Sequence, residues 1–172
     1  GGIGAVIGHE IGHGFDDQGS KSDGTGKLRN WWTDEDKAAF EARTGDLGKQ
    51  YSQFSPIEGH YVNGKFTMGE NIGDLGGLTF ALNAYRISLN GKPSPVIDGL
   101  TGEQRLFMAW AQVWRAKYRD ENMINRLKGA PHSPPEYRTN GVVRNIDAWY
   151  EAFDVKEGDA MYLPPEKRVR IW

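Results

Sequence analysis

Apolar residues recur along most of this chain at the spacing of three or four positions that places them on one face of an α-helix. The ends of these segments carry helix-boundary signals. Thr33 is a residue type that caps helix N-termini, Thr101 and Gln104 have the spacing of a capping box, and Gly91 is suited to end a helix. The pattern predicts helices over residues 3–15, 33–54, 69–90, 101–118 and 146–153.

Signals for β-structure are few. Asn63-Gly64 lies between two short β-prone runs within residues 61–67, which predicts a compact hairpin. Residues 3–15 are small and apolar enough to predict a buried helix, although the glycines weaken its helix propensity. Three prolines surround His132 and predict a loop there. The expected fold is mainly α, formally α+β, with at most small hairpins.

Composition limits the classes of function. The 172 residues suffice for one domain with a sizeable core, so we expect a single domain over residues 1–172. The 21 basic and 23 acidic side chains leave a formal charge of −2 and form no basic block, so nucleic-acid binding has no support. The absence of cysteine excludes disulfides and thiolate zinc ligands. No apolar run approaches the roughly 20 residues that span a bilayer, so no membrane segment is expected.

The first pattern that carries chemistry is His9-Glu10-Ile11-Gly12-His13, an HExxH sequence. Residues four apart lie on the same face of a helix, so both imidazoles can reach one metal ion, and Glu10 lies beside them. The pattern predicts two zinc ligands and a general base that takes a proton from water. It is short, and an isolated match is about as often two ordinary histidines on a helix.

A second pattern, Glu70-x-x-x-Asp74, strengthens the metal interpretation. Hydrolytic zinc needs a third protein ligand and one open position. Glu70 can supply that ligand, while Asp74, one turn further along the same helix face, can accept a hydrogen bond from a ligating histidine. A solvated acidic face is the alternative. The neighbouring glycines, Ile72 and Leu75 favour a buried helix instead, where unpaired carboxylates are costly.

At this point the sequence resembles a known family. The strings VIGHEIGHGFDDQG, GENIGDLGGL, MAWAQVW and PHSPPEYRTNG resemble, in this order, the neprilysin-like zinc metallopeptidases of the endothelin-converting-enzyme and oligopeptidase O type. The resemblance extends over effectively the whole chain, and the lack of cysteines fits the bacterial branch. It implies a thermolysin-like fold, of which this chain is the C-terminal helical part. It also implies a zinc-dependent endopeptidase that cleaves oligopeptides on the amino side of hydrophobic residues.

The resemblance implies a role for each candidate residue. It implies one zinc ion per chain, with the ligands His9, His13 and Glu70. Glu10 corresponds to the general base and proton shuttle, and Asp74 to the carboxylate that holds a zinc histidine. His132 corresponds to the histidine that donates a hydrogen bond to the tetrahedral oxyanion, and Arg138 to the arginine that holds a substrate backbone carbonyl. Without the resemblance, His132 and Arg138 would be interpreted as surface residues.

The family places a substrate-binding strand and most of a helical lid upstream of the HExxH helix, and this sequence contains neither. The first residue is Gly1 rather than methionine, so we expect the C-terminal catalytic portion of a larger metallopeptidase, able to associate with the missing N-terminal part. The parent is expected to be extracytoplasmic: periplasmic, secreted or membrane-anchored. The alternative is a non-catalytic zinc- or peptide-binding fragment that is inactive without its N-terminal region.

A few polar and aromatic residues stay open. Asp16 and Asp17 follow the metal helix closely and can accept hydrogen bonds from a ligand or from the helix end. Solvation in a loop is the simpler interpretation for at least one of them. His60 has no partner pattern and is treated as structural. Trp110 and Trp114 are four apart on a helix, which predicts core packing.

Overall fold

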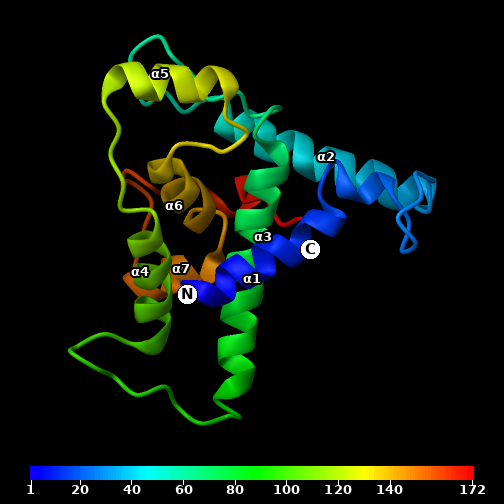
Figure 1. Cartoon of the computed structure of the whole chain (residues 1–172). Coiled ribbons are helices and arrows are strands. Elements are labelled where there is room, and N and C mark those ends of the chain that lie inside the picture. The colour runs from blue at the N-terminus through cyan, green and yellow to red at the C-terminus, as the bar shows by residue number, and fades with distance from the viewer.

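Helices form the framework of the chain. The computed structural model describes residues 1–172 and contains no β-strand, only three isolated bridges. Figure 1 shows how the seven α-helices are arranged, and none of them has the length and apolar character needed to cross a membrane. They are α1 (Ile3–Gly12), α2 (Asp34–Tyr51), α3 (Met68–Ser88), α4 (Gly102–Val113), α5 (Asp120–Gly129), α6 (Pro135–Val143) and α7 (Asp147–Phe153), with short 3-10 helices at His13–Phe15, Gly19–Lys21 and Pro165–Lys167.

The boundary signals in the sequence mark true helix starts. The Thr33 side chain accepts a hydrogen bond from the backbone N–H of Asp36 at 3.1 Å and caps α2. Thr101 and Gln104 form both bonds of a capping box at the start of α4. The helices expected over residues 33–54, 69–90 and 146–153 are confirmed as α2, α3 and α7, with ends that differ by at most three residues.

Other expectations are wrong in detail. The helix expected over residues 101–118 ends at Val113, and two further helices, α5 and α6, follow it. Helix α6 starts at Pro135. Proline is tolerated in the first turn of a helix, because the backbone N–H that it lacks would have no intrahelical acceptor there. No hairpin forms over residues 61–67. The N–H groups of Phe66 and Thr67 instead bond to Asn63, and this turn leads directly into α3.

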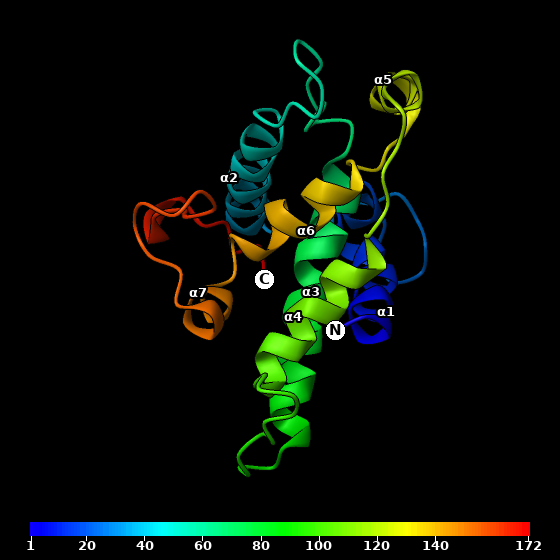
Figure 2. The ribbon, with the colours of Figure 1, turned by 90° about the vertical axis from the view of Figure 1, so that its left-hand side faces the viewer.

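Helix α3 is the central element. Helix α1 crosses it on one side, and α2 and α7 lie on the other side (Figure 2). Helix α6 packs against α3 as well, and α4 packs against α7. Side chains from these helices meet in one core, whose largest fully buried apolar members are Trp110, Tyr51, Leu47, Ile72, Leu78 and Val142.

The buried helix expected at the N-terminus is buried on one face only. Helix α1 presses Ala5 and His9 against α3, where both are buried. On the opposite face, Ile3, Ile7 and Ile11 are 75%, 53% and 65% exposed. A helix that is apolar all round is typical of a fully buried position. The outer face of α1 is therefore an apolar surface that this chain leaves uncovered.

The crossing of α1 and α3 is close because glycines meet there. A Cβ atom at Gly77 would overlap the carbonyl oxygen of Ala5 and lie 2.6 Å from the backbone nitrogen of His9. We therefore expect Gly77→Ala to lower the free energy of unfolding by about 1–3 kcal/mol, the usual cost of overpacking. Urea denaturation of the metal-free chain measures this change.

Gly45→Ala in α2 is the matched control for Gly77→Ala. A Cβ atom at Gly45 meets no atom within 4 Å, and alanine stabilises a helix relative to glycine by about 1 kcal/mol. The two variants should thus shift stability in opposite directions. Equal stabilities would show that α1 can move away from α3 without cost and would contradict the close crossing.

Candidate metal centre

Three side chains converge where the end of α1 crosses α3. The potential ligand atoms of His9, His13 and Glu70 all lie within 4.8 Å of one another. Nε2 of His9 is 3.2 Å from Oε2 of Glu70, and Nε2 of His13 is 3.7 Å from Oε1. The two imidazole rings are perpendicular, with centroids 4.6 Å apart. The structure thus brings together the three residues that the sequence predicts as metal ligands.

His9 is the buried histidine of this group. Its Nδ1 is 2.8 Å from Oδ1 of Asp74, whose side chain is fully buried on α3. Gly73 provides the space, since a Cβ atom there would lie 2.8 Å from the same ring nitrogen. Burial alone would lower the pKa of His9, but the hydrogen bonds and charges of Asp74 and Glu70 raise it to about 9 in the metal-free protein. When Nδ1 donates to Asp74, Nε2 of the neutral ring presents its lone pair to Glu70.

His13 is held by a residue close to it in the sequence. It follows the last turn of α1, its side chain is 33% exposed, and its Nδ1 is 2.8 Å from Oδ2 of Asp16. Each histidine of the cluster therefore has its own carboxylate, Asp74 for His9 and Asp16 for His13. The sequence alone leaves the role of Asp16 open, because its position shortly after His13 is the only signal there.

Glu70 carries a buried oxygen without a hydrogen bond. No donor reaches its Oε2 in hydrogen-bond geometry, although nitrogens of His9, His132 and Arg138 lie 3.2, 3.0 and 3.6 Å away. Burial alone would raise the pKa of Glu70, but the interaction with His9 and the charges of His132 and Arg138 lower it. A carboxylate that faces the imidazole of His9 through Oε2 and that of His13 through Oε1 is a donor set that zinc binds, with a fourth position left open. These residues fit a zinc ion.

Arg138 and Asp74 form a buried ion pair behind His9. Nε and Nη2 of Arg138 donate to the two carboxylate oxygens of Asp74, both at 2.7 Å. The Trp114 ring covers the guanidinium at 3.8 Å, and Trp110 Nε1 donates to the Arg138 carbonyl at 3.0 Å. Core packing is confirmed for fully buried Trp110, whereas Trp114 also orients Arg138, a role that its helical spacing did not indicate. Nη1 of Arg138 makes no hydrogen bond within the protein and is the guanidinium nitrogen free to bind another group.

His132 approaches the ligands from the loop between α5 and α6. Its Nε2 is 3.0 Å from Oε2 of Glu70, and its side chain is 41% exposed. The neighbouring Ser133 is buried and donates to Oδ1 of Asn71 on α3 at 2.7 Å, which anchors the loop beside Glu70. Burial lowers the pKa of His132, opposed by the charge of Glu70 and reinforced by that of Arg138.

Glu10 lies between the two histidines in the sequence. It follows His9 on α1, precedes His13 by three residues, and is exposed. An exposed carboxylate beside two metal-type ligands can exchange protons with water on the open side of the site. His60 lies apart from this group. It closes a short turn with Ile57 and does not belong to the cluster of potential ligands.

Comparison with known proteins gives the family context. The family model described as Peptidase family M13 matches residues 1–169. The chain is 41% identical over its whole length to human neprilysin and 41% identical to the neutral endopeptidase of Lactobacillus helveticus. It covers 23% and 25% of these two proteins, so it spans about a quarter of the length of the curated relatives it matches.

Solved structures agree in fold. The zinc metalloprotease Zmp1 of Mycobacterium tuberculosis, in complex with an inhibitor, superposes with a TM-score of 0.98 and 63% identity over 99% of this chain and 27% of that chain. PEPO from Lactobacillus rhamnosis HN001 superposes with a TM-score of 0.87 and 40% identity over 100% of this chain and 26% of that chain. The mainly helical fold expected from the sequence is confirmed as that of the matching part of these proteins.

Proposed function

The chain belongs to peptidase family M13, and from this premise we propose that it is the zinc-binding, catalytic portion of a metalloendopeptidase, forming a single domain over residues 1–172. The observation that carries the proposal is the convergence of His9, His13 and Glu70, in which Oε2 of Glu70 faces His9 and Oε1 faces His13. The buried Oε2 of Glu70 makes no hydrogen bond, and a bound metal ion would satisfy it. The ligand set leaves the open position that a hydrolytic metal site requires.

We assign a separate step of peptide hydrolysis to each of these residues. One zinc ion per chain, held by His9, His13 and Glu70, would polarise the scissile carbonyl and lower the pKa of a water molecule. Glu10 accepts the proton of the attacking water and delivers it to the leaving amine. His132 donates a hydrogen bond to the substrate oxygen as negative charge develops on it, which stabilises the transition state.

Asp74 and Arg138 act from behind the ligands. Asp74 fixes the ring of His9 through Nδ1, so that Nε2 faces the metal position. Arg138 is held by Asp74 and Trp114, and its free nitrogen, Nη1, binds a backbone carbonyl of the substrate beside the scissile bond. A guanidinium fixed on two sides loses little conformational freedom when it binds, which favours accurate positioning.

We propose oligopeptides as the substrates, cleaved on the amino side of a hydrophobic residue. Trp114 lies over Arg138 and is partly exposed, so an apolar surface adjoins the guanidinium that binds the substrate backbone. A hydrophobic side chain of the substrate can pack on this surface while its backbone contacts Arg138.

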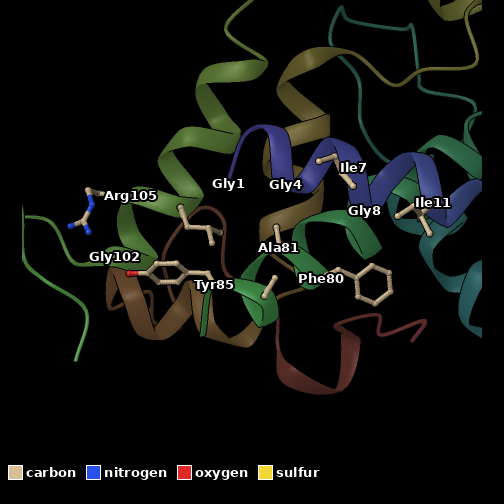
Figure 3. Close-up of a pocket in the computed structure, with 12 residues that line it drawn as sticks. Gly1, Gly4, Ile7, Gly8, Ile11, Phe80, Ala81, Tyr85, Gly102 and Arg105 are labelled. Atoms are coloured by element: carbon tan, nitrogen blue, oxygen red, sulfur yellow. The ribbon is translucent and has the colours of Figure 1, made fainter. Parts of the chain in front are cut away.

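An apolar groove on the surface of the helices supports a partner for this chain. The groove runs along α1, α3 and α4 and has a volume of about 760 Å³. Figure 3 shows its lining, to which Ile7, Ile11 and Phe80 contribute. Because large exposed apolar surfaces mark interaction sites, we propose that another part of a longer M13 peptidase covers this groove. An extracytoplasmic location of that peptidase is proposed on the family resemblance alone.

The experiment that tests the proposed function measures metal content and hydrolysis together. We expect about one zinc per chain by elemental analysis, and cleavage of an internally quenched peptide that a chelator abolishes and added zinc restores. One zinc per chain without cleavage would favour the non-catalytic zinc-binding alternative. Absence of zinc after reconstitution would contradict the proposed metal centre altogether.

A further inference from the structure

His13 depends on one side chain for its orientation. His9 packs against α3, which supplies Asp74. His13 follows the end of α1, and 33% of its side chain is exposed. Apart from the predicted ligand Glu70, the charged side chain that contacts the His13 ring is Asp16, with Oδ2 2.8 Å from Nδ1. A small movement of Asp16 would therefore turn or release this ring.

Asp16 is itself held firmly. Its side chain is 8% exposed, and its Oδ1 accepts hydrogen bonds from the backbone N–H groups of Gln18 and Gly19, both at 2.8 Å. Gly69, at the start of α3, provides the space for the carboxylate, since a Cβ atom there would lie 2.9 Å from Oδ2. The carboxylate is thus fixed through one oxygen and presents the other oxygen to His13.

We propose that Asp16 is the positioning residue of His13 and that its fixed Oδ2 keeps the proton on Nδ1 and directs Nε2 at Glu70. The proposal rests on the proposed zinc centre and concerns a residue outside its ligand set. A carboxylate can only accept from an imidazole, so Nδ1 must be the donor, and Nε2 of the neutral ring is then free to bind a metal. In the other tautomer Nε2 would carry the proton and could not serve as a ligand.

Two substitutions separate this role from the stability of the turn. In Asp16→Asn the single amide oxygen can serve the backbone N–H groups or His13, but not both. When the oxygen serves the backbone, the amide NH₂ group faces Nδ1 and favours the tautomer that cannot bind metal. In Asp16→Ser the hydroxyl can still accept from the turn but is too short to reach His13. Asp17→Asn is the matched control, because its carboxylate accepts from the Gln18 side chain and contacts no histidine.

Two measurements on the 172-residue chain test the proposal. Competition with a chromophoric chelator gives the zinc affinity, and ring-nitrogen chemical shifts of the metal-free protein at high pH give the tautomer of each of its four histidines. We expect both Asp16 variants to bind zinc about 10- to 100-fold more weakly than the wild type. His13 should carry its proton on Nδ1 in the wild type and shift toward Nε2 in Asp16→Asn, while Asp17→Asn matches the wild type in both measurements.

The outcomes separate this role from the proposed function. Asp16 variants with the zinc affinity of Asp17→Asn would overturn it, and so would weaker binding by Asp16→Asn without a change of tautomer. A wild-type chain that binds zinc without cleaving peptides contradicts the catalytic proposal but leaves the Asp16 result decisive. A wild-type chain that binds no zinc overturns the metal centre and the role of Asp16 together.

Discussion

Replacing Glu10 by glutamine should lower the rate of peptide hydrolysis by a factor of about 10² to 10⁴ and leave zinc binding unchanged. Glutamine has nearly the size and shape of glutamate but cannot accept a proton from the attacking water. Glu10 is exposed and lies outside the cluster formed by His9, His13 and Glu70, so the substitution changes neither that cluster nor the core. The turnover rate on a quenched peptide and the zinc content of the same sample measure the two effects.

Glu35→Gln is the control for the loss of one negative charge. Glu35 is exposed in the first turn of α2, on a helix that contributes no residue to the metal centre, so hydrolysis and zinc content should both stay at wild-type levels. Full hydrolysis by Glu10→Gln would remove Glu10 from the mechanism. Loss of zinc from that variant would instead make Glu10 a ligand, because a general base does not hold the metal.

Helices were predictable from the sequence wherever their ends are chemically marked. Thr33 and the Thr101–Gln104 pair cap their helices as expected, because these bonds form between residues three positions apart. Helix α5 follows Arg119, which makes no side-chain capping bond, and α6 starts within a proline-rich stretch that favours a loop when it is considered alone. Helix α6 packs against α3, and α5 meets the core through the partly buried Leu127, neither of which local signals report.

In the candidate site, too, features within one helix were predictable from the sequence, whereas contacts between helices were not. The HExxH spacing and the Glu70–Asp74 spacing each place side chains on one face of one helix, so both halves could be found from the sequence. Their convergence depends on how closely α1 crosses α3. The pairing of Arg138 with Asp74 links residues 64 positions apart, and no local pattern indicates it. Periodicity also shows that α1 is apolar without showing what covers its outer face.

Asp74→Ala is expected to lower the free energy of unfolding of the metal-free chain by about 3–5 kcal/mol, the usual cost of leaving a buried charge without its partner. Asp74 is fully buried and accepts two hydrogen bonds from Arg138 and one from His9. Arginine stays ionised in proteins, so Arg138 cannot avoid the cost by losing its proton. Trp114 covers the guanidinium but supplies no negative charge, and Glu70, with Oε2 3.6 Å from Nη2, makes no hydrogen bond to it. Urea denaturation of the variant and the wild type measures the loss.

The surface pair of Arg86 and Glu103 provides the matched control. There too an arginine donates twice to one carboxylate, at 2.6 and 3.0 Å, but the Arg86 side chain is 46% exposed. Glu103→Ala should therefore cost only about 0–1 kcal/mol, because water replaces the lost partner. Since the pairing with arginine is alike, a larger cost for Asp74→Ala would reflect its burial together with the lost bond to His9, and equal costs would mean that water reaches Arg138.

A double variant, Asp74→Leu with Arg138→Met, tests what the buried pair is for. Stability should recover most of what Asp74→Ala loses, because no charge then stays buried without a partner. His9 would still lack its acceptor, so we expect zinc affinity to stay about 10- to 100-fold below that of the wild type. Recovery of stability without recovery of zinc binding would show that the pair orients His9 rather than holding the fold together. Recovery of both would contradict the positioning role of Asp74.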